Sequence, residues 1–307
     1  MLPAMPPHHP VLDPAVAYPK IAGLRTALDD GDWPACRGLL DPAEPAERTA
    51  LIQAGADEPG LEDFLRGVLR ADPADGAAGA LLGRHLINVG WEVHAEERAE
   101  PGCPECFRKA ERVLISAAAH SPGDHAVWVS RLITARRLEL GRSEARRRYD
   151  RLAELDPHHL PGQVEFLHHL TPRRGGSWER AHRFAVEAAE DAPPGAHQPV
   201  LIAEVHLGRW RETGRGHLAG ETVRAELYDA AHHAVWHPDF RRTHGWVEVV
   251  STFAMVFALL DDQQAAASLF AELGELDSAH PWNLLGDPAT VITKYRRNAE
   301  RAAGGDR

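Results

Sequence analysis

The sequence predicts an all-α protein built as a solenoid of antiparallel helix pairs, and three observations support this. Apolar residues recur every three or four positions, as between Leu61 and Leu69, which is the spacing of one helix face. The chain contains no Asn-Gly hairpin turn and no run of alternating β-branched residues. Helix-ending prolines are evenly spaced, with 35 residues from Pro122 to Pro157 and 36 from Pro157 to Pro193. Such a period with two helices in each unit is typical of a helical solenoid.

Composition places the chain among ordinary globular proteins. It has 307 residues, of which 44% are hydrophobic and 26% charged, which excludes a disordered chain and is long enough for two domains. The longest apolar stretch, around Val249–Leu260, is shorter than the roughly 20 residues that cross a bilayer. The first ten residues do not resemble a signal peptide. Because Cys36, Cys103 and Cys106 do not make a disulfide framework, we expect a cytoplasmic protein.

The net charge of −11 argues against nucleic-acid binding and against binding to an anionic membrane. The basic residues are almost all arginine, which a GC-rich genome explains more simply than selection for anion recognition. Arginines are locally in excess between residues 131 and 148, where the acidic residues are Glu139 and Glu144. This excess indicates either a solvated helix face or a site for an acidic partner. Its members are Arg131, Arg136, Arg137, Arg142, Arg146, Arg147 and Arg148.

The N-terminal part of the chain is expected to cap the solenoid. Residues 1–14 are rich in proline and histidine without periodicity, which predicts a flexible segment. Residues 15–76 are expected to form a helical cap, because terminal units of solenoids are atypical. Its predicted helices are Ile21–Leu28, Trp33–Leu40, Ala46–Ala54 and Leu61–Leu69.

Residues 77–282 are predicted to hold the repeats, and the second helix of each pair carries the clearest pattern. Small residues recur where this helix must press against its neighbours, and an aromatic residue four positions on fills the space between. The matching positions are Ala110, Ala117 and Pro122; Ala145, Tyr149 and Pro157; Ala181, Ala188 and Pro193; and Ala266, Phe270 and Ser278. Residues 283–303 are predicted to form a C-terminal capping helix, and residues 304–307 a tail.

This pattern resembles the tetratricopeptide repeat, and the resemblance covers roughly Ala77 to Asp277. The first helices of the pairs depart from the family, because Ile133 and His169 stand where a small residue is usual. Inserts also interrupt the repeats at His94–Pro104, Thr171–Ser177 and Arg211–Gly220. The chain also resembles uncharacterised repeat proteins that are common in high-GC actinobacteria and have no general assigned activity.

The first helices of a solenoid line its concave groove, so their polar side chains are the candidate binding residues. Charged groups in mid-helix must be solvated or paired, because unpaired burial costs several kcal/mol. The candidates are Arg84, His85, Asn88, Trp128, Arg131, Glu165, His168, Glu204 and His206. They would line a polar groove, either with a bound ligand or without one.

The family resemblance implies a role for three of these residues. Arg84, Asn88 and Arg131 would hold the carboxylate of a peptide, as related positions do in tetratricopeptide proteins that bind C-terminal tails. The leading prediction is therefore a cytoplasmic adaptor that binds a protein or peptide partner. The arginine cluster favours an acidic partner.

The alternative prediction is an enzyme, with or without a metal, whose pocket lies inside the superhelix. If curvature brings neighbouring first helices together, the pocket would gather His85, Glu165, His168, Glu204 and His206. The chain has no H-E-x-x-H, phosphate-binding or nucleophile-elbow motif, so the sequence identifies no catalytic residue.

A third hypothesis is a structural zinc clip at Cys103-Pro104-Glu105-Cys106. C-x-x-C is half of a common zinc site, and thiols at a helix N-terminus have lowered pKa values. His94 is the candidate third ligand, with His125, His85 or Cys36 as alternatives. The same motif also fits plain packing or a redox pair. Apart from this zinc, no cofactor is predicted.

Overall fold

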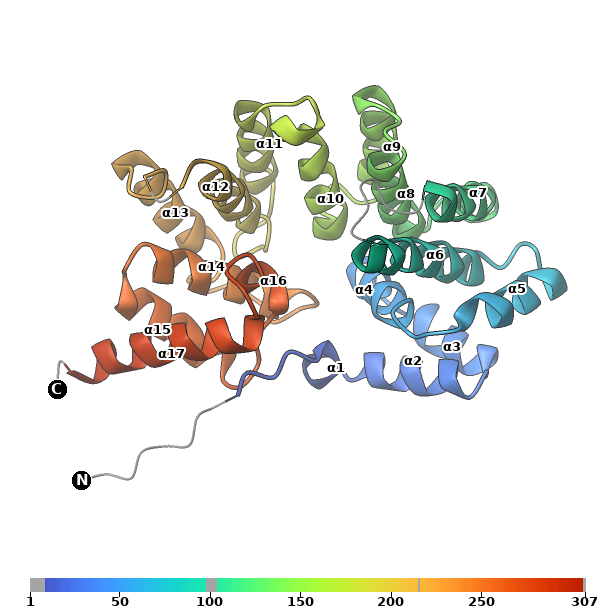
Figure 1. The fold of residues 1–307 in the computed structure, drawn as a ribbon, viewed down its shortest axis with the longest axis horizontal. Helices are drawn as coiled ribbons and strands as arrows, with labels where there is room; N and C mark the ends of the chain where they lie inside the picture. The colour runs from blue at the N-terminus through green and yellow to red at the C-terminus, as the bar shows by residue number, and fades with distance from the viewer. Residues whose placement is uncertain (1–8, 98–103, 215, 306–307) are drawn as a thin grey trace. The chain divides into compact units, whose positions relative to one another are not determined.

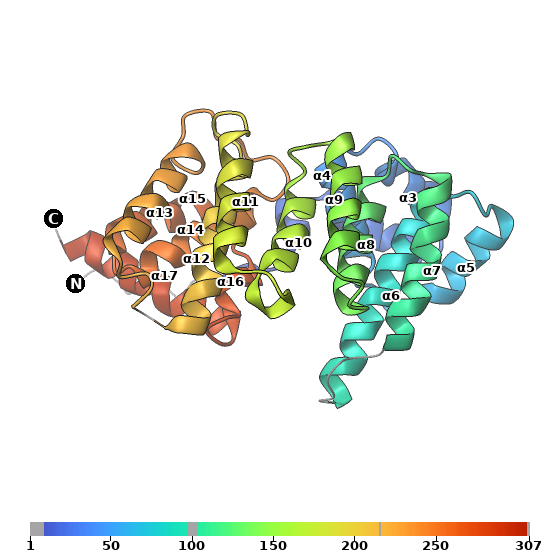
Figure 2. The same ribbon diagram turned by 90° about the horizontal axis from the view of Figure 1, so that it is seen from above.

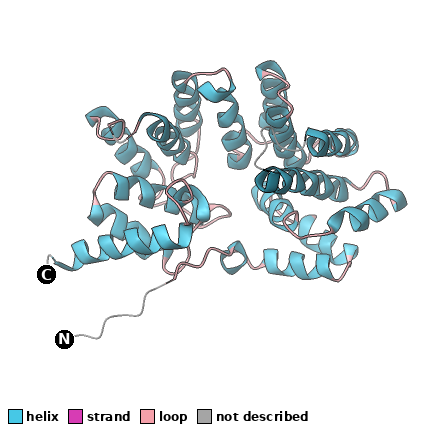
Figure 3. Cartoon of the chain, viewed as in Figure 1, coloured by secondary structure: helices cyan, strands magenta, loops and turns pink. Residues whose placement is uncertain are grey.

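The computed structural model describes residues 9–97, 104–214 and 216–305, and these residues form helices joined by turns and loops (Figures 1 and 3). They form seventeen α-helices and one short 3-10 helix, η1 (Pro172–Arg174), and contain no β-strand. The all-α prediction is therefore confirmed. No helix among the described residues is both long enough and apolar enough to cross a membrane.

The chain separates into two compact units: an N-terminal unit of residues 18–177, and a C-terminal unit of residues 178–307 with residues 1–17. Besides η1, the N-terminal unit contains α2 (Lys20–Asp29), α3 (Trp33–Leu40), α4 (Pro45–Gly55), α5 (Leu61–Ala71), α6 (Gly76–Glu97), α7 (Pro104–His120), α8 (His125–Arg137), α9 (Arg142–Leu155) and α10 (Leu160–Leu170). The C-terminal unit contains α1 (Pro14–Ala17), α11 (Trp178–Glu190), α12 (Val200–Thr213), α13 (Glu221–His233), α14 (Trp246–Leu259), α15 (Gln263–Leu273), α16 (Ala279–Trp282) and α17 (Pro288–Gly305).

Local sequence signals set the helix boundaries. Aspartates begin several helices because their side chains accept hydrogen bonds from backbone N–H groups of the first turn. Asp32, Asp75, Asp124 and Asp262 do so at α3, α6, α8 and α15. At the other end, α5, α7 and α9 each stop two residues before a proline, at Pro73, Pro122 and Pro157.

Consecutive helices of the N-terminal unit pack side by side: α6 on α7, α7 on α8, and α8 on both α9 and α10 (Figure 2). Glycines bring α6 and α7 unusually close. A Cβ atom at Gly79 would lie 2.8 Å from the Cβ of Ala117, and one at Gly90 would lie 3.0 Å from the Phe107 ring. Ala117 is one of the small residues that the repeat pattern places at helix contacts. This packing is compatible with a helical repeat.

Helix α4 packs against α6, α8 and α10. Two polar contacts carry this docking. Arg48 pairs with Asp124 at 2.6 Å, and Thr49 Oγ1 lies 3.1 Å from Nε2 of the buried His159. Helix α4 is therefore tied to the residues that begin α8 and α10.

The C-terminal unit is built around α14, which is buried over most of its length against α12, α15 and α16. A buried polar network ties it to α16 and α17. The Ser251 hydroxyl donates to Asp277 at 2.5 Å, Trp282 Nε1 donates to Ser251 Oγ at 2.9 Å, and Arg296 reaches Asp277 at 3.2 Å. Asp277 thus joins three helices.

The N-terminal segment, expected to be flexible over residues 1–14, contributes to this unit where it is described. Val11 N donates to the Glu275 carbonyl at 2.8 Å, and Asp277 N donates to the Val11 carbonyl at 3.0 Å. Residues 1–8 lie outside the described part of the chain.

Replacing Gly79 by valine is expected to lower the free energy of unfolding by about 1–3 kcal/mol, because the new side chain collides with Ala117. Urea unfolding followed by circular dichroism measures this. Gly38→Ala is the matched control, since Gly38 is a helical glycine with no atom within 4 Å of an added Cβ. It should stabilise the chain by about 0.5–1 kcal/mol. Equal effects of the two substitutions would contradict the close contact.

The docking of α4 predicts a pH-dependent stability. Burial first, and then the neighbouring His125, lower the pKa of His159 from 6.5 to about 4. Below pH 6.5 the unfolded chain binds a proton at His159 that the folded chain does not, so stability falls as the pH drops toward 4. We expect a loss of about 3 kcal/mol from this residue. The loss should shrink in His159→Gln, as measured by urea unfolding between pH 7 and pH 4; an identical loss would refute the assignment.

Candidate functional site

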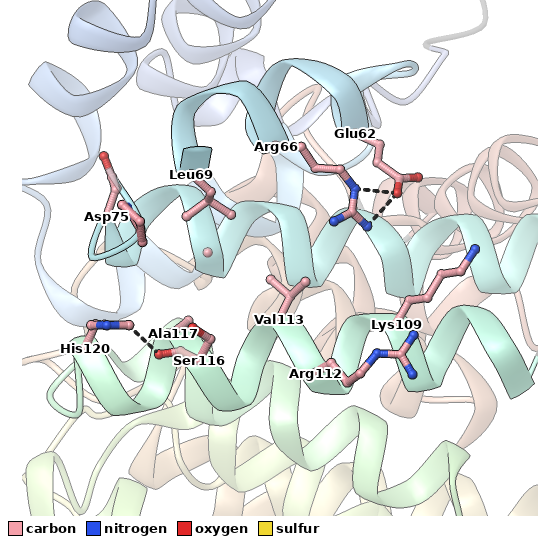
Figure 4. A pocket seen from close by; sticks show the side chains of 12 residues that line it. Glu62, Arg66, Leu69, Asp75, Lys109, Arg112, Val113, Ser116, Ala117 and His120 are labelled. Atoms are coloured by element: carbon pink, nitrogen blue, oxygen red, sulfur yellow. Dashed lines mark hydrogen bonds and ion pairs between the residues drawn. The ribbon is translucent and has the colours of Figure 1, made fainter. Parts of the chain in front are cut away.

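A surface hollow of about 470 Å³ lies in the N-terminal unit between α5, α6 and α7 (Figure 4). Its lining combines a basic rim with an apolar floor. The basic side chains are Arg66, Lys109, Arg112 and His120, and the apolar ones are Leu69, Pro73, Val113 and Ala117. The volume lies within the range of about 300–1,000 Å³ that is usual for ligand pockets.

Helical spacing places these side chains on one wall or the other. On α5, Arg66 and Leu69 are three residues apart and share a face. On α7, Lys109 and Val113 are four residues apart and likewise share a face. Gly79 on α6 lies between the two walls and adds no side chain of its own. The hollow is therefore a direct product of two amphipathic helices flanking a glycine-rich one.

The rim cations are only weakly compensated. Arg66 donates to Glu62 at 2.8 Å, and Arg112 reaches Glu105 at 3.4 Å with both side chains more than half exposed. Lys109 has no hydrogen bond or ion pair with another described residue. At the opposite end Asp75 is already engaged, since Trp33 Nε1 donates to it at 2.8 Å and Arg37 at 3.0 Å. The uncompensated charge in the lining of the hollow is thus positive.

Asp75 stays ionised beneath this end of the hollow. Burial acts to raise the pKa of its carboxyl, but the hydrogen bonds from the Ala78 backbone and from Trp33 outweigh burial, so the pKa lies below its usual value. Because Asp75 also begins α6, its hydrogen bonds fix the start of the helix that forms the back of the hollow.

Two predicted groove residues on α6 contact the residues that follow α4, and they do not line an open groove. His85 Nδ1 lies 3.0 Å from the Ala56 carbonyl, and the Asn88 amide donates to Asp57 at 2.7 Å. These side chains therefore hold the N-terminal helices in place.

Arg84 is only 7% exposed and forms no ion pair within 4 Å among the described residues. Its guanidinium lies 5.4 Å from the centroid of the Trp91 ring. Burial, together with the charge of Arg136, lowers the pKa of Arg84, while Glu165 and Asp57 oppose that shift. Glu165 itself pairs with Arg136 at 3.0 Å, and His168 is exposed.

Arg131 lies with other partners. It pairs with Glu111 at 3.2 Å, and its guanidinium stacks 5.1 Å from the Trp128 ring centroid. Trp128 Nε1 donates to the Pro122 carbonyl at 2.8 Å. Arg84, Asn88 and Arg131 therefore share no common partner, although the tetratricopeptide resemblance implied that they would hold one carboxylate together.

The arginine cluster is neutralised from within. Arg148 reaches Glu111 at 2.8 Å and Glu144 at 2.7 Å, while Thr134 also donates to Glu111. Glu111 comes from α7, the preceding helix, so local sequence counting could not include it. On the exposed face of α9, Arg146 pairs with Asp150 and Arg147 with Glu144. Little of the cluster's charge is left for a partner.

Glu204 and His206 belong to the C-terminal unit, whereas His85, Glu165 and His168 belong to the N-terminal unit. Glu204 accepts from His280 at 2.7 Å. His206 contacts two other residues: its Nε2 lies 2.9 Å from Glu226 Oε2, and its Nδ1 lies 3.0 Å from His217 Nε2. Neither Glu226 nor His217 was singled out from the sequence. Both lie after α12, in segments without a recognisable ligand motif.

Two parts of the predicted zinc clip, Cys103 and the side chain of His94, lie outside the described part of the chain. Cys106 lies half-buried in the first turn of α7 and is disulfide-bonded, so zinc binding there requires the reduced protein. Cys36 is buried and free; burial first, then Asp32, raise the pKa of its thiol to about 11. The zinc clip stays a prediction.

No protein-family model matches the sequence, and no curated protein matches it. The functional residues are therefore inferred from geometry and chemistry alone.

The Glu111 network predicts a large stability effect. Glu111→Ala should lower the free energy of unfolding by about 3–5 kcal/mol, because it leaves the buried Arg131 and Arg148 without their shared carboxylate. Thermal or urea unfolding measures the change. The matched control is Glu154→Ala, which breaks an exposed pair with Arg151 and should cost at most about 0.5 kcal/mol. Similar losses in both variants would show that the network contributes no more than a surface pair.

Proposed function

We propose that this chain is a tetratricopeptide-like helical-repeat protein that binds an acidic protein or peptide segment, in the cytoplasm, through the hollow between α5, α6 and α7. The observation that carries the proposal is the pair of exposed cations Lys109 and Arg112 beside apolar side chains of the same hollow, in a chain whose net charge is −11. The net negative charge of the chain repels acidic proteins in general. Local cations at the hollow therefore favour an acidic partner whose shape fits it.

The chemistry of the hollow favours an amphipathic segment over a small anion. Acidic side chains would reach Lys109 and Arg112, which are exposed and one helical turn apart on α7. Apolar side chains of the same segment would cover Leu69 and Val113. Attraction between opposite charges would mainly speed the association of the peptide with the hollow and fix its position along it. Burial of the apolar side chains would supply most of the affinity.

The hollow is a better candidate than the concave face in this unit. Helix α4 packs on α6, α8 and α10, and the polar groups of His85 and Asn88 already bond to the end of that helix. A peptide binding there would have to displace these contacts. The hollow is lined by residues of α5, α6 and α7 and by none of α4, α8 or α10.

Charge reversal at the rim tests the proposal. Fluorescence anisotropy would follow labelled ten-residue peptides of alternating glutamate and leucine, with lysine–leucine peptides as the charge control. We expect the acidic peptide to bind, with an affinity that falls as salt rises. Lys109→Glu combined with Arg112→Glu should weaken it about tenfold or more.

The matched control is Arg146→Glu combined with Arg151→Glu, which makes the same charge change on the exposed face of α9. It should leave the affinity nearly unchanged. Equal losses in the two double variants would show only a net-charge effect. Failure of the acidic peptides to bind the unaltered chain would refute the proposal.

A further inference from the structure

Three side chains that could ligate a metal converge in the C-terminal unit, far from the hollow in sequence. They are His182 on α11, His206 on α12 and Glu226 on α13. His182 Nε2 lies 2.6 Å from Glu226 Oε1, and His206 Nε2 lies 2.9 Å from Glu226 Oε2. One ligand atom from each residue falls within 4.8 Å of the other two.

Helix packing, and not a local motif, brings these residues together. His182 precedes His206 by 24 residues, and Glu226 follows His206 by 20. Because α11 packs on α12 and α12 packs on α13, one residue from each helix can meet the others. The His206 side chain is 6% exposed, and those of His182 and Glu226 are 36% and 27% exposed. The cluster is thus anchored in the core and reachable from solvent.

A fourth residue orients the buried imidazole. Glu226 as a carboxylate only accepts hydrogen bonds, so both His182 and His206 donate through Nε2–H. The remaining nitrogen of a neutral His206, Nδ1, then accepts from His217 Nε2, 3.0 Å away. These three hydrogen bonds all form among one carboxylate and neutral imidazoles.

We propose that His182, His206 and Glu226 bind a divalent transition-metal ion, with zinc the best suited. Two imidazoles and one carboxylate form a donor set that zinc accepts readily, whereas calcium and magnesium prefer oxygen ligands alone. Neutral imidazole is the form that coordinates metal. Zinc bonds of about 2.0–2.1 Å need only small movements of side chains that already lie in hydrogen-bond contact.

Metal binding would shift protons without a net change of charge on the histidines. The metal takes Nε2 of His182 and His206, and each ring then carries its proton on Nδ1. The proton of His217 moves from its Nε2 to its Nδ1, so that Nδ1–H of His206 donates to His217 Nε2 and the direction of that hydrogen bond is reversed. His217 is therefore a positioning residue that selects the tautomer of a ligand, as outer partners of metal-bound histidines commonly do.

The three-residue donor set also suggests how such a site would work. Structural zinc sites are usually closed by four protein ligands, whereas sites that act on a substrate keep one position open. Within the described residues, His217 touches only the far nitrogen of His206 and does not supply a fourth ligand. This site is independent of the proposed peptide hollow, which lies in the other unit.

The test is metal binding by the full chain, purified, stripped of metal and checked for fold by circular dichroism. Zinc is titrated against a chromophoric chelator, and Co²⁺ is added separately to record its visible spectrum. We expect one zinc per chain at this site, and a tetrahedral cobalt spectrum without a thiolate charge-transfer band. Cys103→Ser combined with Cys106→Ser should not change either result.

Variants locate the site. His182→Ala and Glu226→Gln each remove a half-exposed ligand and should weaken zinc binding at least a hundredfold while the fold is kept. His217→Ala should weaken it about 10- to 100-fold. The matched control is His233→Ala, an exposed histidine on α13, which should have no effect.

Three outcomes would overturn the proposal. The folded, unaltered chain could fail to bind zinc, which would leave the cluster as a hydrogen-bond network only. Binding could be lost in the cysteine variant and kept in His182→Ala, which would assign the metal to the C-x-x-C motif. Equal weakening by His233→Ala would show nonspecific binding by surface histidines.

Discussion

The docking of α4 onto α6, α8 and α10 is the contact on which the N-terminal unit depends. It buries polar side chains at these helices, and a buried polar group must find a partner or cost free energy. Arg48 and Thr49 meet Asp124 and His159, and residues at the end of α4 meet His85 and Asn88. Polar residues that could have lined an open groove therefore hold the fold together.

The same requirement decides where charge remains available. Buried arginines are compensated by carboxylates from other helices, as Glu111 of α7 compensates Arg131 and Arg148. Much of the positive charge in the dense arginine cluster is consequently compensated. At the hollow, the exposed side chain of Lys109 on α7 forms no hydrogen bond or ion pair with another described residue. The candidate binding surface is therefore on α7, and not on α9 with its many arginines.

In the C-terminal unit, stacking of three helices creates a cluster of His182, His206 and Glu226 with no signature in the chain. Each helix contributes one side chain, and the loop before α13 contributes His217, which orients His206. Because each helix needs to present only a single residue, no helix carries a recognisable pair of ligands. A helical repeat can build such a site from residues that look ordinary one at a time.

The sequence by itself determined the all-α class, the four N-terminal helices and the ends of α5, α7 and α9. These depend on helical periodicity, aspartate caps and prolines, which act within a few residues. It also identified His206 and Glu165 as polar groups needing partners, and Ala117 as a point of close contact. Only the tertiary structure decided which partners they have. Glu226, Arg136 and Gly79 lie 20 to 38 residues away from them in the chain, and packing between helices, not local propensity, brings such distant residues into contact.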